Sequence, residues 1–409
     1  MQNTSGIFKT LATSNLRPIK TWVGISFDKS YDPNVGFFEI GTSEIGSNDI
    51  IRGVNVNDVQ NWDKYYYQDL SSRVLSVNTQ RTEDIKGSIT NAITDVVFDN
   101  TDNYFTTGIS PISEKLIPKR PIRVQIGFGN EVVQTFIGIT NKTFEVDYKN
   151  GTATITGIDY LSTILDIVLT DTIDMPATRS DLAIIALLEL GNILEAQMHI
   201  EEGNITFDFY AEEGTTVREN LEKIVEMEQG RLFMDEKGTI TFKNRDSYDT
   251  EPVWDLDYNE DVLDYQNRRE DDIINTVLID NELGLTGSYV DSASVEKYDT
   301  QSYEIQNNFF PDQNTIDVVA RIIVETYKEY GTALEVTSKG LPFLQIGDTI
   351  RLRLSDLVWN NYKITGMVNR VMNPCKYVQI IRLKDYNPFS WFTIGVSQIG
   401  GVDLLKYYL

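Results

Sequence analysis

The chain has 409 residues, of which 41 % are hydrophobic and 24 % are charged, with 61 acidic residues against 36 basic ones. This length and composition predict a globular protein of two or three domains, and they exclude a disordered or low-complexity chain. The net charge of −25 excludes a general attraction to nucleic acid, because phosphate binding needs clusters of Lys and Arg.

Cysteine and histidine each occur once, as Cys375 and His199. One cysteine excludes a disulfide within a monomer and any zinc site built from a Cys cluster, and one histidine excludes every motif that needs two imidazoles. The N-terminus lacks a continuous apolar stretch, and no apolar run approaches the roughly 20 residues that cross a bilayer. We therefore expect neither a secretion signal nor a membrane-spanning segment.

Residues 1–175 are predicted to form a first β-barrel domain. Short stretches rich in β-branched or alternating apolar residues are separated by turns, as in antiparallel barrels and sandwiches. These stretches are residues 19–27, 71–79, 122–128, 131–139 and 152–158. Gly129–Asn130 and Asn150–Gly151 are each predicted to be a two-residue hairpin turn.

Residues 176–248 are predicted to form a small α+β insert. Ser180 is predicted to cap a densely apolar helix, and Thr216 with Glu219 has the spacing of a capping box at the start of a second helix. Gly230 is predicted to end that helix in the left-handed conformation. The following stretches RLFMD and TITFK flank a short turn and predict a hairpin.

Residues 249–385 are predicted to form a second β-barrel domain that includes a helix at 315–330, followed by a C-terminal tail at 386–409. The β pattern returns with INTVLID and continues after the helix with ALEVTS, DTIRLRL, NYKITGMVNRV and KYVQIIRL. The predicted fold is therefore mainly β, with two barrel-like domains around a small α+β domain.

A near-repeat relates FEIGTSEIG, from Phe38, to FTIGVSQIG, from Phe392. Chance similarity of two glycine-containing strands is one explanation, and a shared role in docking on a barrel or a neighbouring chain is the other. The candidate partner-binding residues are Phe38, Ile40, Gly41, Ser43, Ile45, Phe392, Ile394, Gly395, Ser397 and Ile399.

Motifs that would carry chemistry are weak or absent. Gly127 and Gly129 lack the third glycine of a dinucleotide loop and lie between strand residues. The acidic run Asp255–Asp261 begins like a calcium loop, but Glu260 replaces the required glycine and Gln266 replaces the closing glutamate. We therefore predict no catalytic, cofactor-binding or metal-binding residues, and no enzyme activity.

The segment from Arg73 to Val124 and the strands after it resemble the central hub proteins of tailed-phage baseplates and tail tips. In that family a strand ends in an Asp/Asn-rich turn, a basic turn leads into the next strand, and a Phe-x-Gly strand follows. The matching residues here are Phe98, Asp99, Asn100, Asn103, Tyr104, Phe105, Lys119, Arg120, Pro121, Ile122, Arg123, Val124, Phe136 and Gly138. The resemblance covers most of residues 15–385.

This resemblance implies a homotrimeric structural protein of the virion. Two barrels in each of three chains would form a pseudo-sixfold ring that adapts a hexameric tail tube to a trimeric tip, with a passage for tape measure protein and DNA. The implied partners are the distal tail or tail tube protein, the tape measure protein and receptor-binding or fibre proteins, with DNA only in transit. An acidic protein suits such a passage because it would not trap DNA.

Two alternatives remain open at this point. The first is a tail-associated cell-wall hydrolase or endopeptidase, which would require a polar cleft with a perturbed carboxylate. The second is a carbohydrate-binding β protein of the virion surface, for which the aromatic content is the only indication.

Overall fold

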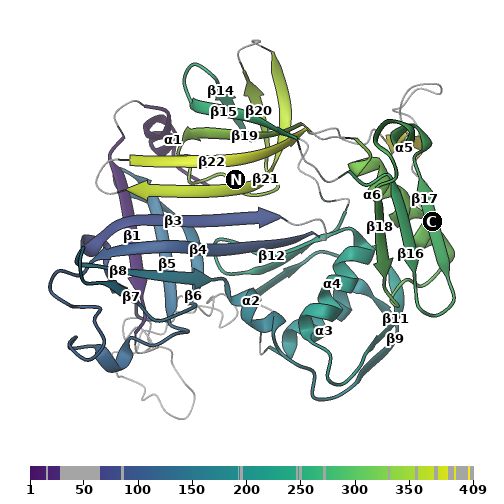
Figure 1. Cartoon of the computed structure of the whole chain (residues 1–409), viewed down its shortest axis with the longest axis horizontal. Coiled ribbons are helices and arrows are strands. Elements are labelled where there is room, and N and C mark those ends of the chain that lie inside the picture. The colour runs from purple at the N-terminus through teal and green to yellow at the C-terminus, as the bar shows by residue number, and fades with distance from the viewer. Residues whose placement is uncertain are drawn as a thin grey trace, which may run out of the picture.

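The computed structural model describes residues 1–14, 17–27, 65–83, 87–191, 193, 197–245, 247, 251–269, 273–329, 332–354, 358–372, 376–385, 391–392 and 404–405. Strands dominate these residues, and most of them belong to one extended, largely antiparallel sheet (Figure 1). The prediction of a mainly β, multidomain chain is confirmed.

The first β region contains the strands before residue 160. Its order is β1–β5–β6–β8–β4–β3, all antiparallel, with β2 beside β1 and β7 beside β8. The pairing of β2 with β1 continues at Leu70, whose backbone N–H donates to Val23 O at 2.9 Å. The strands are β1 (Ile19–Ile25), β2 (Gln68–Asp69), β3 (Val74–Glu83), β4 (Ser88–Asp99), β5 (Pro121–Phe128), β6 (Glu131–Thr140), β7 (Glu145–Asp147) and β8 (Thr152–Ile158).

The second β region has the order β14–β20–β21–β22–β19–β15, in which only the β14–β20 pair is parallel. Strand β21 also pairs with β3 of the first region, with Val371 opposite Val77 (Figure 1). We call this pairing the seam. The strands are β14 (Trp254–Asp257), β15 (Val262–Arg269), β19 (Thr332–Lys339), β20 (Thr349–Arg353), β21 (Trp359–Met372) and β22 (Lys376–Asp385).

One hydrophobic core fills both β regions. It joins Val77 and Ile93 of the first region to Val336 and Ile381 of the second, and Phe8 of helix α1 (Gly6–Thr13) lies within it. The phenyl ring of Phe8 is 5.2 Å from that of Phe128 and 6.1 Å from that of Phe343. Helix α1 therefore stabilises both regions at once.

A second core lies in the helical region, which we define as residues 166–245 and 273–329. It joins helices α3 (Ser180–Glu189) and α4 (Val217–Glu228) to the sheet of β17 (Thr286–Val290), β16 (Thr276–Asp280) and β18 (Ser302–Gln306), which α6 (Gln313–Tyr327) covers. The hairpin of β12 (Arg231–Met234) and β13 (Ile240–Lys243) extends the first β region, because β12 pairs in parallel with the start of β4. The predicted domain boundaries remain a prediction.

The remaining elements come from several parts of the chain. The helices are α2 (Tyr160–Leu165), α3 (Ser180–Glu189), α4 (Val217–Glu228), α5 (Ser292–Tyr298) and α6 (Gln313–Tyr327), and short 3-10 turns span Ser71–Arg73 and Ser113–Lys115. The strands are β9 (Ile173–Arg179), β10 (Met198–Ile200), β11 (Thr206–Ala211), β12 (Arg231–Met234), β13 (Ile240–Lys243), β16 (Thr276–Asp280), β17 (Thr286–Val290), β18 (Ser302–Gln306), β23 (Trp391–Phe392) and β24 (Leu404–Leu405).

The predicted start of α4 is confirmed, and its predicted end is off by one residue. Thr216 and Glu219 form both hydrogen bonds of the capping box. The left-handed residue is Gln229, with φ 52°, and not Gly230. Gly230 is needed for close packing instead, because a Cβ there would lie 2.8 Å from Lys243 O.

Of the two predicted hairpin turns, one is confirmed and one is wrong in length. Gly129–Asn130 is the two-residue turn between β5 and β6, because Phe128 pairs with Glu131. The Asn150–Gly151 prediction is wrong in loop length, since Asp147 pairs with Thr152 and four residues lie between them. The Asp147 carboxylate accepts hydrogen bonds from Lys149 N and Asn150 N, which stabilises the longer turn.

The start of α3 differs from its prediction. Ser180 is the first residue of the helix, after Arg179 at the N-cap position. Its hydroxyl does not cap the helix but donates to the buried carboxylate of Glu228 at 2.5 Å.

Candidate partner-binding surfaces

The near-repeat lies almost entirely outside the described residues. This holds for Phe38, Ile40, Gly41, Ser43 and Ile45 of the first copy, and for Ile394, Gly395, Ser397 and Ile399 of the second. Phe392 is the second residue of β23, and its backbone pairs in parallel with Leu405 of β24. A role in partner binding stays a prediction for all ten residues.

The loop between β4 and β5 is held by the Asp/Asn-rich turn singled out in the sequence. The buried Asn100 accepts a hydrogen bond from Phe105 N at 2.7 Å and donates to the Thr106 hydroxyl at 3.0 Å. Two hydrogen bonds of 2.9 and 2.7 Å join the Arg73 guanidinium to Asp102, and they hold the pKa of that carboxyl below its usual range. These hydrogen bonds stabilise the turn.

This loop presents apolar side chains to solvent. Ile109 is 65 % exposed and Ile117 is 48 % exposed. Farther along the chain, β6 packs tightly on β8, because a Cβ at Gly138 would lie 2.2 Å from Ile158 O. The two exposed isoleucines give this loop an apolar surface that is available to a partner.

A second surface combines arginine, aspartate and tryptophan on β14, β20 and β21. The parallel register places Asp255 beside Arg351 and Asp257 beside Arg353, and each pair forms an ion pair. Both guanidinium carbons lie over the Trp359 ring, at 4.9 and 5.0 Å from its centroid. The acidic run that resembled a calcium loop is therefore neutralised in part by arginines, and the tryptophan and arginines of this surface are residue types enriched at interfaces.

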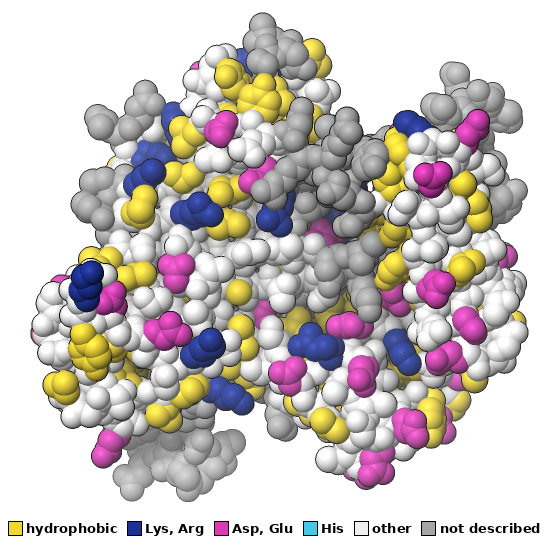
Figure 2. Space-filling view, viewed as in Figure 1, with side chains coloured by type: hydrophobic (Ala, Val, Ile, Leu, Met, Phe, Trp, Pro, Cys, Tyr) yellow, Lys and Arg dark blue, Asp and Glu magenta, His cyan; other side chains and the backbone are white. Residues whose placement is uncertain are grey.

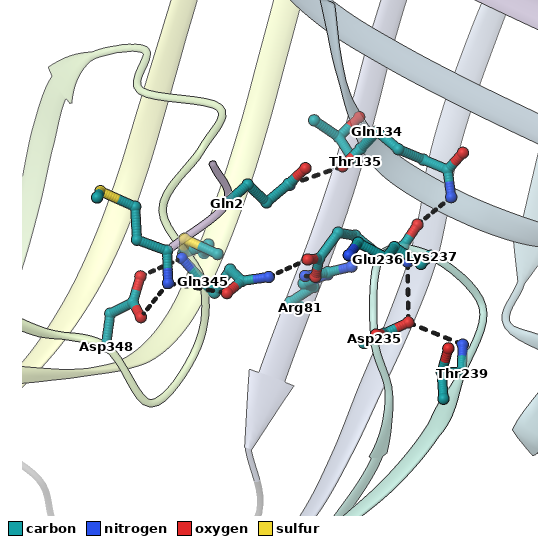
Figure 3. A network of polar contacts seen from close by, with 12 residues as sticks. Gln2, Arg81, Gln134, Thr135, Asp235, Glu236, Lys237, Thr239, Gln345 and Asp348 are labelled. Carbon is teal, nitrogen blue, oxygen red and sulfur yellow. Dashed lines mark hydrogen bonds and ion pairs between the residues drawn. The ribbon is translucent and has the colours of Figure 1, made fainter. Parts of the chain in front are cut away.

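A polar network joins the two β regions to the β12–β13 turn (Figure 3). Glu236 of that turn accepts a hydrogen bond from the Gln345 side chain of the second region and lies 3.6 Å from the Arg81 guanidinium of β3. Gln134 of β6 donates to the backbone carbonyl of Glu236. Sequence reasoning missed this network, because its members come from distant parts of the chain and form no local motif.

A cavity of about 480 Å³ lies beside this network. Its lining includes Arg81, Arg231, Lys243, Glu236 and Asp348. His199 also lines it from β10, where its side chain is exposed. Cys375 lies outside the described residues.

The negative charge of the chain is concentrated in the helical region. Its residues include 27 acidic and 10 basic ones, whereas the rest of the chain has 34 and 26. Figure 2 shows Asp and Glu side chains gathered on the side of the molecule where Figure 1 places β9, β11, β16 and β17. The acidic residues are therefore distributed unevenly along the chain.

Within the described ranges, no helix is long and apolar enough to cross a membrane. The same residues contain no group of three or more His, Cys, Asp or Glu side chains placed to hold a metal ion.

The fold is that of a class of phage tail proteins. The chain superimposes on the crystal structure of a tail protein from Neisseria meningitidis MC58 with a TM-score of 0.55 and 13 % identity, covering 78 % of this chain and 94 % of that one. The 43 kDa tail protein of prophage MuSo2 from Shewanella oneidensis gives a TM-score of 0.54 and 13 % identity, covering 78 % and 95 %. At this identity the likeness establishes the fold.

Comparison of the amino-acid sequence with family models and with curated proteins found no match. No protein-family model matches the chain. No curated protein matches it either.

Proposed function

We propose that this chain is a structural protein of a phage tail that acts as a hub at the tail tip or baseplate. The observation that carries the proposal is the match to two phage tail proteins over 94 and 95 % of their lengths. In this proposal the domains are the two β regions and the insert, with boundaries at residues 175, 248 and 385. The proposal assigns no catalysis to the chain.

Three copies would form the hub ring. Each chain contributes two β regions joined by the seam, so that a trimer presents six of them to a hexameric tail tube. The β regions suit contacts between copies better than the helical region does, because the helical region carries a net charge of −17 and would repel its own copies.

The proposed partners are the tail tube or distal tail protein, the tape measure protein and receptor-binding or fibre proteins. Tape measure protein and DNA would pass through the ring, and acidic walls would not retain DNA. The near-repeat residues from Phe38 and Phe392 are proposed to contact a neighbouring chain.

Light scattering on the purified protein tests this proposal. The chain has a mass of 46.6 kDa, so that a trimer has a mass of about 140 kDa. We expect the trimer to gain population as protein concentration rises. A stable dimer at all concentrations would contradict the hub, because a two-fold assembly cannot match a three-fold tip.

A further inference from the structure

Strand β17 is the outermost strand of the sheet β17–β16–β18. It pairs with β16 alone among the residues that the structure describes. Strand β18 lies on the inner side, where the Tyr303 hydroxyl donates to Glu226 of α4 at 3.0 Å. Figure 1 shows this sheet at the side of the molecule farthest from the first β region. An outermost strand presents a row of backbone N–H and C=O groups with which a further strand can pair.

The register identifies the residues of β17 that supply these groups. Asn281 N donates to Leu285 O at 3.0 Å, and Asp291 N donates to Asn275 O at 2.9 Å. Because hydrogen-bonded and non-hydrogen-bonded pairs alternate in an antiparallel ladder, every second residue after Leu285 bonds to β16. The residues that direct their backbone groups away from β16 are Thr286, Ser288 and Val290. We call this row the outer edge, and no hydrogen bond from elsewhere in the described ranges reaches its backbone groups.

Contacts with α6 hold β17 in place. A Cβ at Gly287 would lie 2.4 Å from the Ile316 side chain, so that this strand lies directly against the helix. The Tyr289 hydroxyl donates to the Glu325 carboxylate at 3.2 Å. The outer-edge residues, in contrast, are exposed, with Val290 at 50 %. A strand that is already held in its extended conformation loses little conformational entropy when it binds a partner.

The outer edge lacks the usual protection of an edge strand. Strand β17 reads TGSYV and contains neither a charged residue nor a proline. Strand β15, which also pairs with a single strand within the described part of the chain, carries Asp264, Arg268 and Arg269. Charged side chains and proline are the usual means by which edge strands avoid pairing with other chains. Strand β17 is therefore open to the addition of a strand.

The charges around the outer edge select the kind of partner. No Lys or Arg occurs between Arg269 and Lys297. Asp280 of β16 and Glu304 of β18 are exposed beside β17, and Glu282 is exposed in the turn before it. The helical region as a whole carries a net charge of −17. This field repels a second copy of the same region and attracts a basic segment.

We propose that the outer edge of β17 binds an extended basic segment of another protein, which adds to the sheet as a further strand. The three outer-edge residues would pair with the backbone of the segment, and Asp280 and Glu304 would attract its Lys or Arg side chains. Val290 and Leu278, which is 41 % exposed, would contact apolar side chains that alternate with the basic ones. The proposal does not rest on the hub function.

Fluorescence anisotropy on the full chain tests the proposal with a fluorescein-labelled peptide of alternating valine and lysine. We expect saturable binding that weakens as the salt concentration rises. The same peptide with N-methylated backbone amides cannot donate to the outer edge and should bind about tenfold more weakly or worse. A peptide of alternating valine and glutamate should not bind. Equal binding of the N-methylated peptide would overturn the proposal, because it would show attraction by charge alone.

Variants of Ser288 test the position of the site. Ser288→Pro removes an N–H of the outer edge and no bond to β16, and proline is tolerated in edge strands, so that only peptide binding should fall, by about tenfold or more. Ser288→Lys serves should Ser288→Pro fail to fold, since it places a charge that repels the basic peptide. Thr107→Lys adds the same charge to the exposed loop between β4 and β5 and should bind as the wild type does.

Three further results would overturn the proposal. The first is binding by both Ser288 variants equal to that of the wild type, and the second is the absence of saturable peptide binding to the wild type. The third is self-association of the wild type that Ser288→Pro abolishes, without peptide binding, which would assign the outer edge to a second copy of the chain. We expect Ser288→Pro to keep the oligomeric state of the wild type, so that failure of this proposal and failure of the hub are distinguishable.

Discussion

Asn369 of β21 donates its side-chain amide to the hydroxyl of Thr79 on β3 at 3.2 Å, and so joins the two β regions across the seam. Its carbonyl oxygen accepts hydrogen bonds from Tyr377 Oη at 2.8 Å and from Gln379 Nε2 at 3.0 Å. All four side chains are buried. The seam therefore has a specific polar pairing inside an otherwise apolar core, and a shift in strand register would leave these groups unpaired.

Removal of the Tyr377 hydroxyl tests this pairing. Tyr377→Phe should lower the free energy of unfolding by about 1 kcal/mol, because one buried hydrogen bond is lost and the ring remains. Tyr148→Phe is the matched control, since Tyr148 is 73 % exposed, and it should change little. Urea unfolding followed by tryptophan fluorescence measures both variants, and equal effects would show that the buried network contributes nothing.

Helix α1 provides a second test, because neighbouring residues in it have opposite environments. Phe8 is fully buried between Phe128 and Phe343, whereas Ile7 is 76 % exposed. Phe8→Ala should cost about 3–5 kcal/mol of stability through the cavity that it leaves. Ile7→Ala should stay within about 0.5 kcal/mol of the wild type. Similar unfolding midpoints for the two variants would contradict the placement of α1.

Gly138 tests the close approach of β6 and β8. A Cβ there would lie 2.2 Å from Ile158 O, so that Gly138→Ala must shift a buried strand and should cost about 1–3 kcal/mol. Gly6→Ala is the control, because nothing lies within 4 Å of a Cβ at the start of α1. That substitution should leave the thermal midpoint unchanged or raise it slightly. A thermal midpoint for Gly138→Ala equal to that of the wild type would contradict the observed spacing of β6 and β8.

Lys363 should make the free energy of unfolding increase with pH in the alkaline range. Burial lowers the pKa of this lysine from 10.5 to about 8, even though Glu83 lies 3.6 Å from its ammonium group and favours the charge. Arg231 and Lys384 lower the pKa further by repulsion. Below pH 8 the cost of the buried charge is present in full. Between about pH 8 and 10.5 the unfolded chain holds more protons than the folded one, so that this group raises stability as pH rises.

The measurement is the difference in unfolding free energy between wild type and Lys363→Met across this pH range. The unfolding free energy of the wild type, relative to that of Lys363→Met, should increase by on the order of 1–3 kcal/mol as pH rises, since one pKa unit corresponds to about 1.4 kcal/mol. A difference that stays flat, or that moves the other way, would show that the lysine is well solvated in the folded chain.

Local features of this fold were predictable, and long-range pairings were not. The capping box at Thr216 and the Gly129–Asn130 turn depend on residues within a few positions of each other, which a pattern detects. The seam pairs β3 with a strand about 290 residues later, and no periodicity specifies that register. The same holds for Arg81 and Glu236, whose proximity depends on how the insert hairpin docks.

The errors have equally physical causes. Gly230 looked like a left-handed helix end, but Gln229 takes that conformation, and Gly230 is required because a Cβ there would clash with Phe242 and Lys243. The acidic run at Asp255 and Asp257 gave no hint of its partners, since Arg351 and Arg353 come from a strand almost 100 residues later.

Electron microscopy of the purified chain at high protein concentration tests the central proposal most directly. The hub predicts ring-shaped particles with threefold symmetry, a central opening and contacts between copies formed by the β regions. Particles of the same mass with no opening, a ring of another symmetry, or monomers at every concentration would contradict it.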